Sequence, residues 1–420
     1  MAEPRAWAIR RVPGALMAGR NIAPLPAVNA GFLAVLIGFT SSAAIVFSAA
    51  RAAGADDAEL ASWMLALCVG MGVTCIGLSL RYKAPIVTAW STPGAALLAT
   101  GLTGHSMPEA IGAFVVSAAL ITLTGVTGWF GRVMDRVPTE LAAALLAGVL
   151  IRFGMGLFSS ANTDVTLILA MFGTYLLCRR FLPRYAVLAA LLVGVTVAAV
   201  TGTFRPGAVR FSWAEPVFTM PSFSWQAVIG VAVPLFVVTM ASQNLPGVAV
   251  LRNDGYDVPV SPLITWTGTV NLLLAPFGAF GLNLAAITAA ICTGPQALAD
   301  PRRRYLAAVW AGVFYLIVGV LGATITSLLG ALPVVLVLGI AGIGLLGTIG
   351  SSLSTALRGD RWREAAVVTL LATASGIEML GIGSAFWGLI AGVLTAGATG
   401  ALRRRPDAEP AEARQGGRAR

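Results

Sequence analysis

Long apolar stretches, separated by short breaks that carry charge, proline or glycine, constrain this chain more than any other feature. Val28–Ala50, Ala110–Phe130 and Tyr185–Thr203 each have about the length of a membrane-spanning helix, which is roughly 20 residues. Of the 420 residues, 57% are hydrophobic and 11% are charged, whereas about 25% are charged in soluble domains. One soluble core cannot bury so much apolar surface, so the sequence predicts an all-α polytopic membrane protein.

The breaks between apolar stretches divide the chain into fourteen expected transmembrane segments. Basic residues test this division, because cytoplasmic loops are enriched in Lys and Arg. With the N-terminus placed inside, the outer loops contain only Arg51, Arg205 and Arg210. We therefore expect both termini in the cytoplasm. The segments are expected at 28–50, 60–80, 84–101, 108–130, 137–157, 163–181, 185–203, 224–248, 260–276, 278–294, 305–329, 333–357, 362–379 and 382–402.

Two sequence features recur about 195 residues apart and indicate an internal repeat. Ala95–Gly101 resembles Ala289–Gly294, and the fifth and twelfth segments begin near Pro138 and Pro333. Since each copy has seven segments, an odd number, the second copy must be inverted, as in many secondary transporters. The expected organisation is a cytoplasmic tail (1–27), a first repeat (28–203), a second repeat (224–402) and a disordered cytoplasmic tail (403–420).

The third segment combines a strand-like stretch with a helix too short to cross the membrane. Ile86–Trp90 is β-branched and aromatic, which favours extended backbone. Ser91 or Thr92 suits a helix N-cap, and Pro93 suits the first helical position. The helix that follows has about eight residues, or roughly 12 Å. The sequence therefore predicts a short strand followed by a half-helix.

The tenth segment repeats this design. Pro276–Leu282 looks extended, Asn283 is expected to cap, and a half-helix is expected from Leu284 to about Thr293. Non-helical backbone at membrane depth is tolerated only where protein covers it or where it lines a cavity. Inversion should bring the two helix N-termini face to face, and their free N–H groups and positive dipole ends favour a small anion.

Other polar residues add to this expected site. The hydroxyl of Ser41 could bond back to its own helix or face the site. Gln243 and Asn244, followed by Pro246, are costly in lipid unless they face a cavity or a partner. Trp90 offers an aromatic surface.

The sequence contains no motif for enzymatic chemistry. It has no HExxH metal motif, no glycine-rich nucleotide loop and no intramembrane cluster of His and acidic residues, so we expect no enzyme activity, no metal and no cofactor. Basic residues occur in short clusters rather than on one face, which argues against nucleic acid. A channel is disfavoured because no charge ring or carbonyl filter is visible.

Three segments resemble hallmarks of a known family. Ala89–Leu98, Ser242–Gly247 and Leu284–Ala290 are similar to segments of the benzoate/proton symporter (BenE) family, and Asp300–Tyr305 fits as well. The resemblance extends from about Val28 to Leu402. It implies a secondary transporter of the inner membrane that imports benzoate or a related aromatic monocarboxylate together with a proton.

More distantly, the chain is similar to the uracil/proton symporter and the sulfate-permease group. That resemblance implies a core domain (28–130 plus 224–329) moving against a gate domain (137–203 plus 333–402), with homodimers that contact through the gate. The uracil symporter carries glutamates near its ligand, where this chain has Gln243, Asn244 and Asn283. A proton could instead ride on the carboxyl group of the substrate.

These features together predict one mid-membrane site made of helix N-termini and neutral donors. Without a compensating Arg or Lys, such a site should accept one negative charge. The alternative is a nucleobase or other small-anion permease of the same fold, and the sequence leaves the particular acid and the coupling ion open. The predicted substrate-binding residues are Ser41, Trp90, Ser91, Thr92, Gly94, Gln243, Asn244, Asn283, Leu284 and Thr288.

Overall fold

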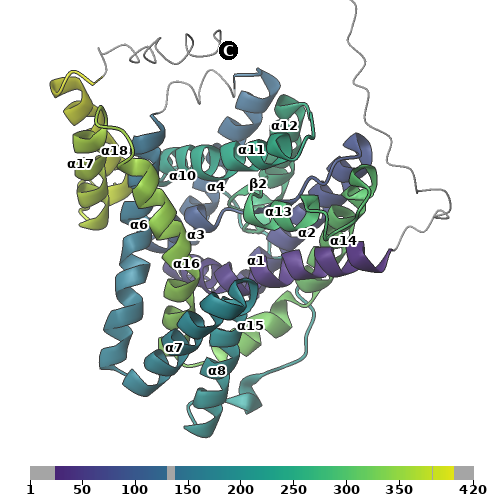
Figure 1. Cartoon of the computed structure of the whole chain (residues 1–420). Coiled ribbons are helices and arrows are strands. Elements are labelled where there is room, and N and C mark those ends of the chain that lie inside the picture. The colour runs from purple at the N-terminus through teal and green to yellow at the C-terminus, as the bar shows by residue number, and fades with distance from the viewer. Residues whose placement is uncertain (1–23, 130–137, 381, 402–420) are drawn as a thin grey trace, which may run out of the picture.

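The computed structural model describes residues 24–129, 138–380 and 382–401, so the expected tails up to residue 23 and from 403 to 420 lie outside the described residues. Helices build most of the described chain (Figure 1). Eight helical stretches are long and apolar enough to cross a membrane. They are α1 (Leu25–Ala52), α2 (Asp57–Tyr82), α4 (Met107–Val126), α6 (Thr139–Ser159), the stretch Trp225–Arg252, α12 (Val260–Leu274), α14 (Tyr305–Val320) and α16 (Val334–Ala356).

Shorter elements account for the other expected segments. The fold is therefore compatible with fourteen segments, although several of their bounds differ from those expected. The expected segment 305–329 is two helices, because α14 ends at Val320 before α15 begins at Gly322, and α1 already begins at Leu25 rather than at 28. The shorter elements are α3 (Thr92–Gly101), α7 (Val165–Phe181), α8 (Ala186–Val200), α13 (Ile287–Thr293), α15 (Gly322–Gly330), α17 (Arg363–Ala374), α18 (Ser384–Ala398) and the strands β1 (Thr88–Trp90) and β2 (Leu282–Leu284).

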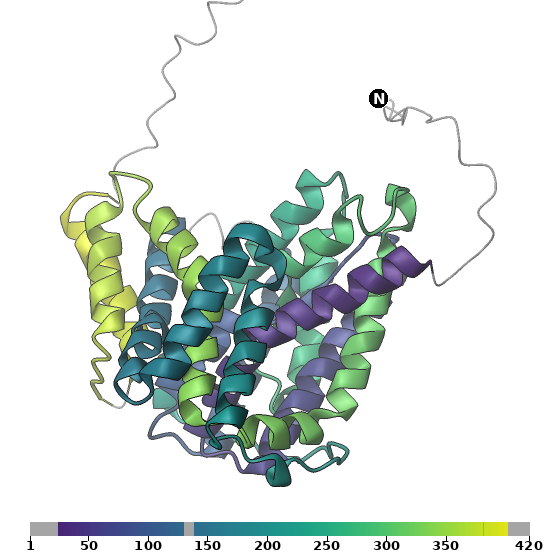
Figure 2. The ribbon, with the colours of Figure 1, turned by 60° about the horizontal axis from the view of Figure 1, so that its bottom comes forward.

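The helices pack in two groups. In one, α16 packs against α6, α17 packs against α18 and α6, and α7 packs against α8. In the other, α14 packs against α2 and α1, α12 packs against α4, and α3 packs against α1. Figure 2 shows the first group, with yellow α17 and α18 at its edge, beside the group that contains purple α1. Helices α1 and α16 meet where the groups adjoin.

The two strands pair with each other although nearly half the chain separates them. The pairing is antiparallel, with Thr88 opposite Leu284, Ala89 opposite Asn283 and Trp90 opposite Leu282. Strand backbone is thus hydrogen-bonded inside protein, as membrane depth requires. Antiparallel pairing of corresponding strands is compatible with a second repeat that is inverted relative to the first.

The eighth expected segment is one helix with two widened turns. It consists of α9 (Trp225–Ala227), α10 (Val233–Thr239) and α11 (Leu245–Asn253), joined by π-helical turns at Val228–Ala232 and Met240–Asn244. Each π turn is followed at once by a helix that carries proline in its first turn. A widened turn accommodates the proline ring and its missing N–H. The helix therefore continues past the second proline to Asn253, beyond the expected end of the segment at 248.

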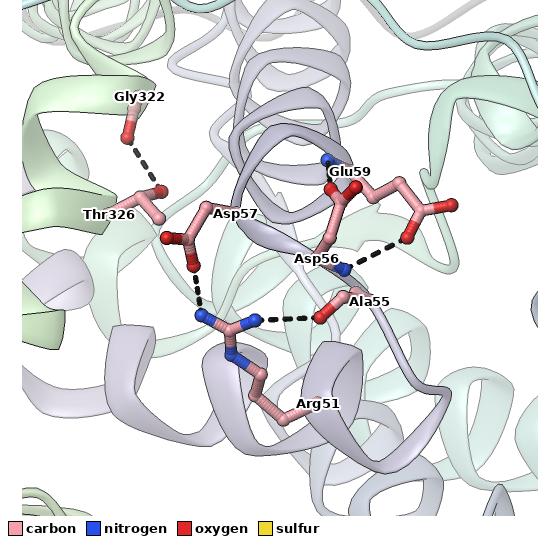
Figure 3. A network of polar contacts seen from close by, with 7 residues as sticks. All are labelled: Arg51, Ala55, Asp56, Asp57, Glu59, Gly322 and Thr326. Carbon is pink, nitrogen blue, oxygen red and sulfur yellow. Dashed lines mark hydrogen bonds and ion pairs between the residues drawn. The ribbon is translucent and has the colours of Figure 1, made fainter.

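Local sequence fixes the turn between α1 and α2 (Figure 3). The N–H of Glu59 donates to Asp56 Oδ1 at 2.7 Å, and the N–H of Asp56 donates to Glu59 Oε2 at 2.9 Å, which is a capping box. Arg51 pairs with Asp57 and donates to the carbonyl of Ala55. The two helices therefore run antiparallel from a turn that their own residues hold.

Candidate functional site

The first half-helix begins as the sequence predicts. Ser91 is the N-cap of α3, and its hydroxyl accepts the N–H of Gly94 at 3.0 Å. The N–H of Ser91 donates to the carbonyl of Gly281 at 2.9 Å, and Thr239 donates its hydroxyl to Ser91 Oγ at 3.2 Å. Thr92 is then the first helical residue, which leaves its side chain free of the cap.

The second half-helix begins differently, and the predicted cap is wrong. Asn283 lies in β2, whereas α13 begins only at Ile287, with Ala286 at its N-cap position and no side-chain cap. A strand residue that pairs with β1 cannot also cap a helix that begins four residues later.

The approach to β2 is also less extended than expected. Pro276 and Phe277 belong to a 3-10 turn that ends at Gly278 with a φ of 100°. An added Cβ at Gly278 would lie 1.9 Å from the Trp63 ring, so only glycine fits there. Proline favours the first turn of a helix, which explains why the extended backbone starts after this point.

Two buried amides hold the inner end of β2. The N–H of Leu284 donates to Asn244 Oδ1 at 2.9 Å, and Asn244 is fully buried. In the orientation that gives both amide atoms of Asn283 a partner, its oxygen accepts the N–H of Ser91 at 3.1 Å and its nitrogen donates to the Leu284 carbonyl at 3.2 Å. The two amide side chains therefore form hydrogen bonds with the backbone of the paired strands and of Ser91.

A cavity of about 290 Å³ lies where α1, α3, α13, α14, α16 and the π turn Met240–Asn244 meet. Of the ten predicted site residues, Ser41, Trp90, Thr92, Gln243 and Thr288 line it. The other five, Ser91, Gly94, Asn244, Asn283 and Leu284, are buried and absent from its lining. Its remaining lining residues are Ile37, Gly38, Ser42, Ala89, Pro93, Ser242, Pro246, Ala285, Ala286, Tyr315, Gly344, Leu345, Thr348 and Ser351.

The hydroxyls of α1 bond to their own helix. Ser41 donates to the carbonyl of Gly38 at 3.0 Å, and Ser42 donates to the same carbonyl at 2.7 Å. Ser42 Oγ also accepts Trp90 Nε1–H at 2.8 Å, and the Trp90 ring lies 5.4 Å from the Phe39 ring. The indole is therefore fixed as one wall of the cavity.

Five other polar lining side chains have no hydrogen-bond partner among the described residues. They belong to Thr92, Gln243, Thr288, Tyr315 and Thr348, and the buried Thr288 Oγ1 is fully enclosed without a partner. An added Cβ at Gly38 would lie 3.1 Å from Thr288 Cγ2 and 3.5 Å from Tyr315 Oη, so this glycine brings both side chains to the wall of α1. Sequence reasoning missed Tyr315, although a lone tyrosine inside an apolar segment signals a hydroxyl that needs a partner.

The cavity wall is uncharged in the described chain. None of its lining residues is Asp, Glu, His, Lys or Arg. Arg152, the basic residue within the expected fifth segment, lies on α6 beside Gly376, where an added Cβ would be 2.9 Å from the guanidinium. Any charge on a ligand must therefore be met by dipoles and neutral donors.

A second cavity of about 280 Å³ adjoins the first, with which it shares Ser242, Pro246, Thr348 and Ser351. It extends to Thr139 at the start of α6 and to residues at the end of α16. Hydroxyl groups of α16, including Ser352 and Thr355, line this extension. The two cavities together mark a path, lined by apolar side chains and hydroxyl groups, from the site to one end of the helix bundle.

The two groups of helices also touch beside the site. An added Cβ at Gly344 of α16 would lie 2.4 Å from the carbonyl of Ser41. Near the end of α3, an added Cβ at Gly383 would lie 3.8 Å from the Cα of Gly101. The two groups of helices are therefore in direct contact at these two points.

Known proteins match nearly the whole chain. The family model described as benzoate membrane transport protein (BenE) matches residues 21–398. The chain belongs to the benzoate membrane transport family. This BenE chain is 51% identical over 369 residues to inner membrane protein YdcO of Escherichia coli, covering 88% of this chain and 94% of that protein. It is 40% identical over 370 residues to the benzoate membrane transport protein of Acinetobacter baylyi, with the same coverage of 88% and 94%.

Solved structures with low sequence identity share the fold. The BenE chain superimposes with a TM-score of 0.59 on the transmembrane domain of the cyanobacterial bicarbonate transporter BicA, at 14% identity, covering 90% of this chain and 98% of that one. The overall structure of SLC26A9 gives a TM-score of 0.58 at 14% identity, covering 90% of this chain and 66% of that one. The protein is thus a multi-pass membrane transporter with the fold of these transmembrane domains.

Proposed function

We propose that this transporter imports benzoate or a related aromatic monocarboxylate across the inner membrane. The observation that carries the proposal is the cavity, in which an immobilised indole faces a set of unpartnered neutral donors. The relative from Acinetobacter, described as a benzoate membrane transport protein, supports the same substrate class.

The size of the cavity suits one aromatic ring. Its volume of about 290 Å³ lies at the lower end of the roughly 300–1,000 Å³ of small-molecule sites. Trp90 supplies a flat face whose orientation is fixed by its bond to Ser42 and by Phe39. A benzoate ring would stack or pack edge-on against this indole.

The carboxylate would be held without a formal positive charge. An uncompensated buried carboxylate costs several kcal/mol or more, whereas each hydrogen bond to a charged group contributes about 1.5–3 kcal/mol. The hydroxyls of Thr92, Thr288 and Tyr315 and the amide of Gln243 supply such bonds, and the N-terminus of α3 adds its dipole. This compensation suits one negative charge, so dicarboxylates and sulfate should bind far more weakly than benzoate.

Proton coupling would use the substrate itself. The described cavity lining has no carboxylate or imidazole that could exchange a proton. A benzoate anion that binds at the site and takes up a proton on its own carboxylate before release would carry H⁺ without a protein group. We therefore propose H⁺ as the coupling ion, with the carboxyl group of the substrate as its carrier.

Transport would occur by alternating access of a core domain (28–130 plus 224–329) against a gate domain (137–203 plus 333–402). Both half-helices belong to the core, whereas the gate supplies Gly344, Thr348 and Ser351 of α16. The cavity is open toward Thr139, at the end that the charge pattern predicts as cytoplasmic. Movement of the core along α16 would close this path and open the opposite one.

Uptake of labelled benzoate into proteoliposomes tests the substrate and the coupling ion. Gradients of pH, Na⁺ and voltage are imposed one at a time, and the proposal expects that an inward pH gradient drives accumulation. Unlabelled phthalate and sulfate should compete weakly. Accumulation driven by Na⁺ alone would contradict proton coupling, and binding of a nucleobase without binding of benzoate would contradict the substrate class.

A disulfide between the two domains tests the motion. Gly101 and Gly383 have room for a side chain and lie close together, so a Gly101→Cys/Gly383→Cys variant can be oxidised across the contact. Oxidation should stop transport and leave benzoate binding measurable, and reduction should restore transport. The two single-Cys variants serve as controls, and undiminished transport in fully cross-linked protein would contradict the proposed motion.

A further inference from the structure

A separate groove lies on the surface between α2 and α12. Its volume is about 330 Å³, and it shares no lining residue with the two cavities of the transport path. The lining residues are Val73, Thr74, Gly77, Leu78, Arg81, Tyr82, Trp266 and Val270. The groove is therefore separate from the proposed path of the substrate.

The groove is elongated and largely apolar. Val73 and Arg81 lie eight residues apart on α2, or roughly 12 Å along its axis. Val73 is 50% exposed and Trp266 is 56% exposed, and an added Cβ at Gly77 would meet no atom within 4 Å. The hydroxyl of Thr74 is bonded to Thr88, so it offers little to a polar ligand. These features suit a hydrocarbon chain that lies along α2.

One end of the groove carries a free positive charge. Arg81 lies in the last turn of α2, is exposed and faces the Tyr82 ring at 5.4 Å. The exposed Lys83 lies two residues further along the chain, with its ammonium 4.8 Å from the centre of the Tyr305 ring. In the described part of the chain the ion pairs are Arg51 with Asp57 and Arg363 with Asp360. The Arg81 guanidinium therefore has no carboxylate partner there.

We propose that this groove binds an anionic phospholipid, with one acyl chain along α2 and the phosphate at Arg81. An acyl chain gains little by leaving other chains, since lipid tails are as apolar as leucine. Selection must therefore come from the headgroup, and arginine at a membrane surface attracts anionic lipid and bonds phosphate with two parallel N–H donors. Tyr82 and Trp266 are residues typical of the membrane–water boundary.

The position of the groove also indicates which leaflet would supply the lipid. The charge pattern places Arg81 and Lys83 at the cytoplasmic end of α2, so the lipid would come from the cytoplasmic leaflet. There the negative surface potential adds to the attraction.

Native mass spectrometry of the purified full chain tests the proposal. Phosphatidylglycerol and phosphatidylcholine with identical acyl chains are titrated separately, and the wild-type protein should retain the first more strongly. Arg81→Gln should weaken retention of phosphatidylglycerol about fivefold and leave phosphatidylcholine unchanged. Gly77→Leu fills the groove and should reduce retention of both lipids.

Gly173→Leu on α7 is the matched control, because an added Cβ at Gly173 also meets no atom within 4 Å. It should retain lipids like the wild type. Equal retention of both lipids by the wild type, or unchanged selectivity in Arg81→Gln, would overturn the proposal. A Gly77→Cys variant that cross-links to a second copy would also overturn it, because the groove would then face protein.

Discussion

The two half-helices are corresponding parts of the proposed repeats, yet they are held in different ways. The side chain of Ser91 caps α3 within its own segment, and α3 has ten residues. Helix α13 has seven residues and no side-chain cap, and the strand before it is held by Asn244 from a distant helix. The first half-helix is thus fixed locally, whereas the second depends on tertiary contacts.

This difference bears on binding as well as on folding. Ser91 satisfies the N–H of Gly94 before any ligand arrives. In the first turn of the uncapped α13, the buried hydroxyl of Thr288 has no partner. An enclosed polar group without a partner costs free energy that a hydrogen-bonded ligand can recover. Bound substrate should therefore stabilise the second half-helix, α13, more than the first, α3.

A negative charge in the cavity between the two half-helices should have the largest effect on benzoate binding. Gln243→Asp places a carboxylate in the cavity wall, and two unit charges about 5 Å apart at an effective dielectric constant of 20 repel by about 3 kcal/mol. Benzoate affinity should fall roughly 10²-fold at high pH and recover at low pH, where the new acid is protonated. Gln243→Leu should weaken binding without this pH dependence. Calorimetric titration across pH measures both, and normal binding by the Asp variant at alkaline pH would place the anion elsewhere.

Removal of the unpartnered hydroxyl should weaken binding without loss of stability. Thr288→Val loses a hydrogen bond to a charged group, worth about 1.5–3 kcal/mol or at least tenfold in affinity. The empty protein should be equally or more stable, because the orphan hydroxyl is gone. Thr174→Val, on α7 outside the cavity, is the control and should bind benzoate normally. Unchanged affinity in Thr288→Val would mean that the substrate does not use α13.

Loss of the tertiary support should destabilise the fold. Asn244→Ala leaves the buried N–H of Leu284 without an acceptor, at a cost of about 1–3 kcal/mol. Thermal melts in detergent, with and without benzoate, would measure the change. Melting at the wild-type temperature would show that Asn244 is dispensable for β2.

Loss of the Ser91 cap should reduce the stability of the fold least. Ser91→Ala removes an N-cap, which typically costs about 1 kcal/mol, whereas Ser91→Gly costs only a few tenths. In the same melts the order of loss should be Asn244→Ala, then Ser91→Ala, then Ser91→Gly. A larger loss for Ser91→Ala than for Asn244→Ala would reverse the comparison between the two halves.

The sequence predicted much of the fold because lipid imposes strong rules. Apolar length, charged breaks and the positions of Ser91 and Pro93 located the segments and the first strand with its half-helix. The sequence also located the second half-helix but placed its start too early, at Leu284 instead of Ile287. The reason is that an asparagine such as Asn283 is equally suited to cap a helix or to bond strand backbone. Local propensity cannot decide between these two roles.

For the site, sequence by itself determined which segments are broken and that the polar groups among them are neutral. Tertiary structure alone decided which of these groups reach the cavity. In the folded chain Asn244 and Asn283 bond strand backbone instead of lining the cavity. Tyr315 and Thr348, from other helices, line the cavity, and the hydroxyl of Thr288 has no partner. The physical reason is that a buried polar group takes the nearest partner that packing provides, and packing joins segments that lie far apart in the chain.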